Sequence, residues 1–172
     1  MAIEGRLAYS WASSSASGNR PPRIEAVLNT PDIDLDRLLG LPEATRRRPL
    51  VAVKSFADFF AGTPRPPIPV KLGITVENMT LAGATLVRVS SNVKSDGETW
   101  DVESLDFRAP GAAQVRLAGR LGINSTGITF AGPAKVEARD PRALVAWLTD
   151  RADAQVAAAG PFRAEGEVAL GS

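Results

Sequence analysis

Residues 113–148, AQVRLAGRLGINSTGITFAGPAKVEARDPRALVAWL, decide the fold of this chain. Residues 113–123 alternate between apolar and polar side chains, which is the period of a half-buried β-strand. After the turn-forming run Asn-Ser-Thr-Gly at 124–127, the alternation resumes over 128–138 and predicts a hairpin. Asp140 then supplies an N-cap side chain and Pro141 the first residue of a helix. The stretch therefore predicts a strand, a turn, a second strand and a capped helix.

A similar order of features occurs near the N-terminus. Residues 3–11 and 23–28 are predicted strands, and the Ser-rich loop between them, residues 12–22, is expected to be mobile. A helix is predicted to begin at Thr30-Pro31 and to end at Gly40, the residue type that favours a left-handed helix terminus.

Short sequence matches connect the two regions. Gly5-Arg6-Leu7 matches Gly119-Arg120-Leu121, and a third, truncated copy is predicted to begin at Ala164. Repeats at this spacing indicate an elongated sheet built from similar units. Gly5, Gly119 and Gly166 lie inside strand patterns, where glycine marks a bend or bulge, or else an edge strand.

The residues between these copies form an insertion and then a run of strands. A helix is predicted at 50–61, and a Pro-rich segment follows it. Arg46, Arg47 and Arg48 suggest a phosphate or nucleic-acid contact, but no aromatic residues are interleaved with them, so a solvated loop is favoured. From residue 70 to residue 139 the alternation and turn signals predict five consecutive antiparallel strands.

These patterns predict one β-rich α+β fold: a twisted antiparallel repeat-type sheet with two or three short helices packed on one face or at the ends. We divide the chain into a strand–strand–helix unit at 1–40, a helical and Pro-rich insertion at 41–69, an antiparallel sheet with a capped helix at 70–150, and the start of a further strand at 151–172. Because the chain opens and stops within strand patterns, we expect it to be a piece of a longer protein.

Composition limits the range of functions. The chain has 172 residues, of which 44% are hydrophobic, and a net charge of +1, so a charge-driven partner such as nucleic acid is not expected. It contains no histidine and no cysteine, which removes the usual residues of nucleophilic and metal-dependent mechanisms. We therefore expect no catalytic residues, no metal and no cofactor.

Two groups of side chains invite a functional reading. The carboxylates Asp101, Glu103 and Asp106 are compatible with a glycosidase-type acid–base pair, but a solvated sheet face explains them better. The aromatic residues line either a ligand groove or an ordinary core, and the core is favoured; they are Trp100, Phe107, Phe130 and Trp147.

Four segments together resemble the AsmA-like proteins of Gram-negative envelopes. They are VKLGITVENMTLAGATLVRVSSNVK at 70–94, TWDVESLDFRAPGAAQVRLAGRLG at 99–122, FAGPAKVEARDPRALVAWL at 130–148 and a degenerate copy at 3–39. The resemblance implies a large periplasmic protein, anchored in the inner membrane by an N-terminal helix that is absent from this sequence. It also implies a curved sheet that offers an apolar trough to lipid, and a link to outer-membrane biogenesis.

Two functions of different classes follow. The first is non-enzymatic lipid transport, with phospholipid acyl chains on a candidate apolar groove of Leu72, Ile74, Val102, Leu105 and Phe107. The second is an interaction scaffold for outer-membrane protein assembly, whose sheet edges dock neighbouring segments of the same chain or envelope proteins. A hydrolase ranks far behind both. A trough requires apolar side chains open to solvent on a concave face, whereas a scaffold buries them under helices.

Overall fold

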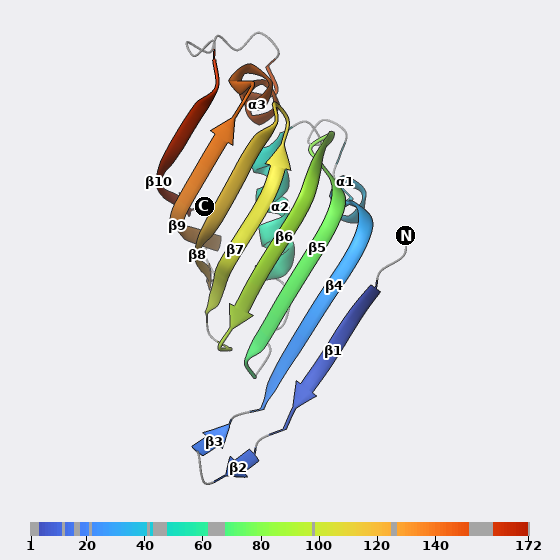
Figure 1. The fold of residues 1–172 in the computed structure, drawn as a ribbon, viewed down its shortest axis with the longest axis vertical. Helices are drawn as coiled ribbons and strands as arrows, with labels where there is room; N and C mark the ends of the chain where they lie inside the picture. The colour runs from blue at the N-terminus through green and yellow to red at the C-terminus, as the bar shows by residue number, and fades with distance from the viewer. Residues whose placement is uncertain are drawn as a thin grey trace.

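The computed structural model describes residues 4–11, 13–15, 18–20, 22–40, 42, 48–61, 68–97, 99–124, 127–151 and 160–171. Its main feature is an eight-stranded sheet within these residues, in the order β1-β4-β5-β6-β7-β8-β9-β10 (Figure 1). The strands are β1 (Glu4–Ser10), β4 (Arg23–Asp34), β5 (Val70–Leu81), β6 (Ala84–Ser95), β7 (Trp100–Ala109), β8 (Ala113–Asn124), β9 (Gly127–Ala138) and β10 (Phe162–Gly171). The short strands β2 (Ser13–Ser15) and β3 (Gly18–Arg20) pair separately.

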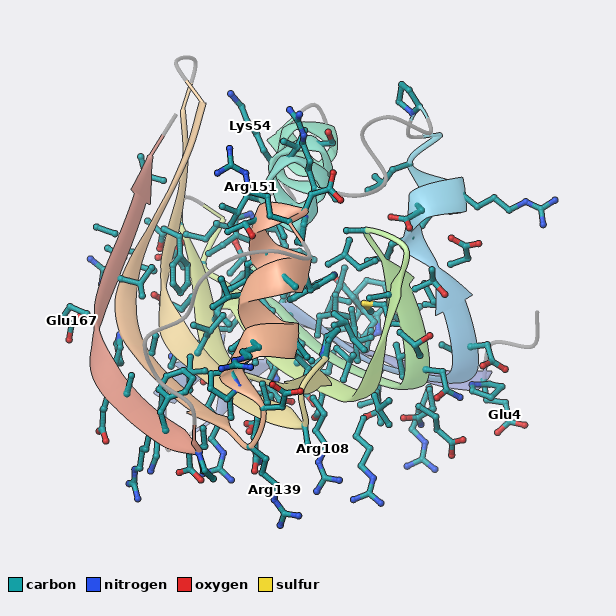
Figure 2. All side chains as sticks on the ribbon, turned by 90° about the horizontal axis from the view of Figure 1, so that it is seen from above. Glu4, Lys54, Arg108, Arg139, Arg151 and Glu167 are labelled. Carbon is teal, nitrogen blue, oxygen red and sulfur yellow. The ribbon has the colours of Figure 1, made fainter. Side chains whose placement is uncertain are left out.

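The sheet is curved, and its helices lie on the concave side. The helices are α1 (Leu35–Leu38), α2 (Pro49–Ala61) and α3 (Pro141–Thr149). Figure 2 shows α2 and α3 within the curve, whereas Arg108 and Arg139 point away from the opposite, convex side. This arrangement follows from the period-2 pattern, because alternation places apolar residues on one face and charged residues on the other.

The buried core lies at one end of the concave face, beside the three helices and the tight turns. Most of its residues cluster around the β5–β6 turn, the β7–β8 turn and the β9–α3 junction, and α2 contributes Ala52; the core residues are Leu35, Ala52, Val76, Leu81, Ala82, Leu86, Val89, Ala109, Ala113, Ala138 and Leu144. We call this the near end of the sheet. The far end is the opposite one, where β4, β5, β7 and β9 begin.

A buried carboxylate connects α1 to the near end. Asp36 is only 4% exposed, and its side chain accepts hydrogen bonds from the backbone N–H groups of Ala82 at 2.8 Å and Gly83 at 2.9 Å. Both turn residues have positive φ, 53° at Ala82 and 70° at Gly83. Since a positive φ is costly for alanine, this carboxylate stabilises a turn that the local sequence alone disfavours.

The β-rich α+β prediction is confirmed at this level, but the all-antiparallel sheet is wrong. The strands β5 to β9 are consecutive antiparallel neighbours, as predicted. The strands β4 and β5, however, pair in parallel, so the sheet is mixed. Residues 35–69, which include α1 and α2, separate these two strands and supply the long crossover that parallel pairing needs.

The helix predictions had different outcomes. The helix after Asp140 is confirmed, with the Asp140 side chain accepting from the backbone N–H groups of Arg142 and Ala143. The helix predicted from Thr30-Pro31 is wrong at its start, because β4 continues through Pro31 and α1 begins at Leu35 with Asp34 as its N-cap. The parallel register omits Pro31, which has no N–H to donate to the ladder.

The predicted mobile loop also needs a correction. Within 12–22 the structure has the two paired strands β2 and β3, so this segment is not a plain loop. Residues Ala12, Ala16, Ser17 and Pro21 of this segment, and residues 45–47 of the basic run, lie outside the described residues.

Candidate functional site: the concave face of the sheet

Three rows of side chains cross the concave face at the far end of the sheet, and we call them the far rows. Cross-strand partners define them, because directly opposed residues point to the same face. The first row contains Val70, Ser95, Trp100, Leu121 and Phe130. The second contains Leu72, Val93 and Val102, and the third contains Ile74, Ser91, Leu105 and Leu117. Most of these side chains are apolar, so the alternation produces a wide apolar surface.

The five predicted groove residues all lie on this face, and the structure divides them into two groups. All five are half-buried. Ile74, Leu105 and Phe107 pack against the buried core, whereas Leu72 and Val102 lie outside that cluster. Leu72 and Val102 are therefore the better candidates for ligand contact, since their burial does not come from the core at the near end.

The aromatic residues divide in the same way. Phe107 and Trp147 pack against the core, as the core interpretation expects. Trp100 and Phe130 are half-buried in the first far row, where both are cross-strand partners of Leu121. The predicted groove set omits Trp100, Leu121 and Phe130. Two signals in the sequence could have found residues of this row. Trp100 is two residues from Val102 and Leu121 is four from Leu117, so each shares a face with its neighbour, and the Asp96-Gly97 turn sets the register.

The half-buried residue Trp147 has a polar atom without a hydrogen-bond partner among the described residues. The indole N–H of Trp147 is buried, and no hydrogen-bond acceptor is found for it within the part of the chain that the structure describes. Trp147 lies on α3, which packs on the concave side of the sheet (Figure 2). The indole ring is thus buried although its N–H makes no hydrogen bond in the described structure, which is uncommon for a buried donor.

The convex face is charged and carries exposed ion pairs between neighbouring strands. Glu103 lies 3.2 Å from the ammonium of Lys94, Asp106 lies 2.8 Å from Arg116 and Asp101 lies 3.6 Å from Arg120. Each of the three carboxylates has a basic partner on a neighbouring strand. This arrangement supports the solvated sheet face over an acid–base pair, because a catalytic pair places two carboxylates around one bond.

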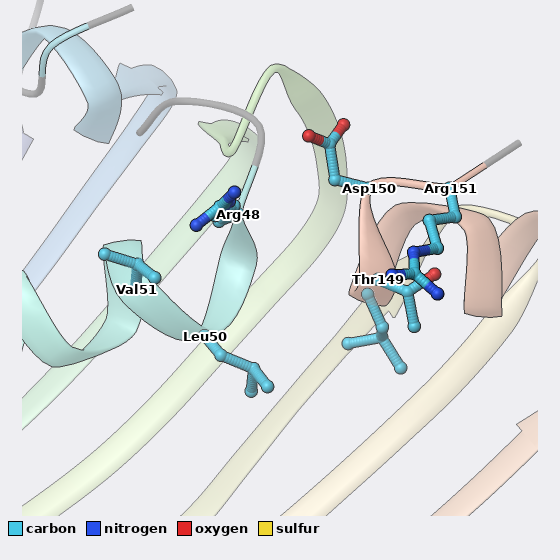
Figure 3. A pocket seen from close by; sticks show the side chains of 7 residues that line it. Arg48, Leu50, Val51, Thr149, Asp150 and Arg151 are labelled. Atoms are coloured by element: carbon cyan, nitrogen blue, oxygen red, sulfur yellow. The ribbon is translucent and has the colours of Figure 1, made fainter. Parts of the chain in front are cut away.

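A small cavity lies away from the far rows, between the start of α2 and the end of α3. Its volume is about 310 Å³, and it is lined by Arg48, Leu50, Val51, Leu148, Thr149, Asp150 and Arg151 (Figure 3). The lining mixes exposed apolar side chains with two arginines and one carboxylate. It does not have the predominantly apolar lining with a few convergent polar groups that is typical of a ligand pocket.

Among the residues that the structure describes, no group of three or more acidic side chains is placed to hold a metal ion. Within the same residues, no helix combines the length and the apolar character needed to cross a membrane.

Comparisons of this chain with protein-family models, with curated proteins and with solved structures found no match. The AsmA-like resemblance consequently rests on the sequence pattern of the quoted segments, and what it implies about function is a proposal.

Proposed function

We propose that the far rows bind the acyl chains of phospholipids, and that the chain is a non-enzymatic segment of an AsmA-like protein that contributes to lipid transport in the cell envelope. The observation that carries this proposal is the division of the apolar face into a core at the near end and mostly half-buried, mostly apolar rows at the far end, of which only the third packs against that core, through Ile74 and Leu105. The periplasmic location and the inner-membrane anchor of the parent protein belong to the same proposal and rest on the resemblance.

The chemistry of the far rows suits hydrocarbon. The second row places Leu72, Val93 and Val102 side by side across β5, β6 and β7. Burying such side chains against an acyl chain gains about 25 cal/mol for each Å² removed from water. The charged groups of these strands lie on the convex face, so an acyl chain on the concave face leaves the ion pairs there intact.

The first experiment is native mass spectrometry of the purified 172-residue chain, in which we expect co-purified phospholipid. The second is titration with a phosphatidylethanolamine that carries a fluorescent acyl chain. Leu72→Asp should weaken its binding at least about tenfold, because an unpaired carboxylate against hydrocarbon costs several kcal/mol.

A matched control lies on the same strand. Thr75 is exposed on the opposite face of β5, so Thr75→Asp adds the same charge without entering the far rows. We expect this variant to bind like the unmodified chain. Equal binding by Leu72→Asp and the unmodified chain, or the absence of any bound lipid in the mass spectra, would overturn the proposal.

Leu105 is a poorer probe of binding than Leu72, because it packs against the core. Leu105→Ala should destabilise the fold by about 2 to 5 kcal/mol, whether or not lipid binds nearby.

The scaffold function has one observation in its favour. The sheet ends in two unpaired edges in the described part of the chain, β1 on one side and β10 on the other. An edge strand presents unpaired N–H and C=O groups that another strand can extend. Edge pairing and lipid binding use different surfaces, so the two functions are separable by experiment.

A further inference from the structure

The two edges of the sheet differ in how well they are protected from pairing. On β10 the convex face carries Arg163, Glu165 and Glu167. The concave face carries the exposed small residues Ala164 and Gly166 between Phe162 and Val168, which are both half-buried. Charges and small residues are the usual protection of an edge strand. The β10 edge is therefore less suited to hydrophobic pairing than an edge with exposed large apolar side chains.

The β1 edge carries large apolar side chains instead. All seven residues of β1 are exposed. On the concave face Leu7 is 74% exposed and Tyr9 is 44% exposed, and Trp11, directly after the strand, is 78% exposed. The rings of Tyr9 and Trp11 meet edge to face, with centroids 4.6 Å apart. An exposed apolar edge of this kind marks a site of strand pairing.

The occupant that fits this edge is a second copy of β1. We propose that two copies of this chain pair antiparallel through β1, about a twofold axis that passes at Ala8, and so join two eight-stranded sheets into one. Gly5, Leu7, Tyr9 and Trp11 are evenly spaced, and their centre is Ala8. An antiparallel register centred there pairs Leu7 with Tyr9 of the other copy and Gly5 with its Trp11.

This register is self-complementary in both size and charge. The bulky Trp11 ring would cover the bare backbone of Gly5, a pairing that compensates for glycine on an edge. Aliphatic and aromatic partners such as Leu7 and Tyr9 stabilise antiparallel pairs. On the convex face Arg6 would face Ser10, so like charges are not opposed. By contrast, an axis at Arg6 would set the two Arg6 guanidinium groups against each other.

A pair of identical strands is the isologous interface of twofold dimers, the most frequent symmetry among oligomers. Each side-chain contact then occurs twice. Seven paired residues make a small interface, so we expect a dimer that dissociates at roughly micromolar concentrations. Sedimentation equilibrium of the 172-residue chain should show mass rising with concentration from one copy to two and no further.

Chemical cross-linking tests the register, and the chain contains no cysteine that would interfere. Cα atoms of directly opposed antiparallel residues lie about 4.5 to 5.5 Å apart, which suits a disulfide. Ala8→Cys should therefore form a covalent dimer under mild oxidation. Ser10→Cys is the matched control on the same face. Its two thiols would be four residues out of register, about 13 Å apart along the strands, and should not cross-link.

Edge substitutions test the surface itself. Leu7→Lys and Trp11→Lys together should raise the dissociation constant at least about tenfold, since each change counts twice in the dimer. Both residues are exposed, so circular dichroism should be unchanged. Ala164→Lys on the β10 edge is the control and should leave the dimer intact.

Three results would overturn the proposal. They are a single monomeric mass at every concentration, equal cross-linking of the Ala8→Cys and Ser10→Cys variants, and assemblies that grow beyond two copies. The last would show β1 pairing with β10 of the next copy, because that contact does not close. Lipid binding is not needed for any of these measurements, so failure of the dimer would leave the proposed function standing.

Discussion

Removing the Asp36 carboxylate should destabilise the fold more than any other single change at a polar side chain of α1. Asp36 accepts two hydrogen bonds, from Ala82 at 2.8 Å and Gly83 at 2.9 Å, and it is buried. Bonds from an N–H to a charged acceptor contribute about 1.5 to 3 kcal/mol each. Gly83 is exposed, so water can replace the lost acceptor there, whereas the N–H of buried Ala82 would be left without one.

We therefore expect Asp36→Ala to lower the free energy of unfolding by about 2 to 4 kcal/mol. For a chain of this size that is a fall of roughly 5 to 12 °C in Tm. Asp36→Asn should cost less, because its amide oxygen can keep one of the two bonds while the amide nitrogen faces an N–H group. Urea unfolding followed by circular dichroism measures both changes, and an unchanged denaturant slope shows that the same fold is being compared.

The control is Asp34, the exposed N-cap of the same helix, which accepts from the backbone N–H of Arg37 at 2.9 Å. Asp34→Ala should cost about 1 kcal/mol. If Asp36→Ala costs no more than Asp34→Ala, the carboxylate does not stabilise the β5–β6 turn, and our account of the positive φ at Ala82 would have to be abandoned.

Three other substitutions test separate features of the fold by the same unfolding measurement. Asp140→Ala should cost about 1 kcal/mol because it removes the cap of α3, and a change below a few tenths would show that the cap is not stabilising. Trp147→Phe should cost less than about 1 kcal/mol because the buried indole N–H has no acceptor in the described structure, whereas Leu144→Ala nearby should cost about 2 to 5 kcal/mol. Gly132→Ala should cost about 1 to 3 kcal/mol because its new Cβ would meet the backbone of Ala118 and Gly119, while Gly166→Ala has open space around it and should be nearly neutral.

Much of the central sheet was predictable from local pattern. The strands from Val70 to Ala138 alternate with period 2, and the Asp96-Gly97 pair marks the β6–β7 hairpin, where the Asp96 side chain accepts from the backbone N–H of Thr99 at 2.7 Å. Alternation also placed the five candidate groove residues on one face. These features depend on neighbours a few residues apart, which is the range that sequence patterns record.

The parallel pairing of β4 with β5 was not predictable in the same way, because periodicity does not encode the direction of a strand's neighbour. An insertion was predicted at 41–69, but a role of these residues in a crossover between parallel strands was not. The extension of β4 past Pro31 was missed because Thr30-Pro31 has the features of a helix start. Asp34, followed by Asp36 in the first turn, was the better signal for the start of α1.

The sequence also did not predict which of the five candidate groove residues pack against the core and which do not. Whether Leu105 or Leu72 contacts the core depends on where the helices and tight turns gather, and that is settled by contacts between residues far apart in sequence. The same holds for Asp36, whose partners lie 46 and 47 residues away. A local pattern shows that a side chain faces inward, but not what it meets there.

The curvature that shapes the far rows has an identifiable origin in the central strands. The β6–β7 ladder shifts register between Asn92 and Val93, and the β7–β8 ladder shifts between Val102 and Leu105. Both shifts lie between the second and third far rows, and each extra residue bends and twists its strand.

On the adjoining pair, β8 and β9, the backbones of Gly119 and Gly132 approach so closely that a Cβ on either would collide with the other strand. Bulges and facing glycines therefore occur together within the far rows. A flat sheet with the same alternation would display the same side chains without curving around a ligand. Gly132→Ala accordingly separates two requirements of the proposed acyl-chain binding, because it disturbs the bend while leaving the apolar side chains of the far rows in place. Weaker lipid binding by a folded Gly132→Ala variant would show that curvature is needed as well as apolar area, and unchanged binding would show that the area suffices.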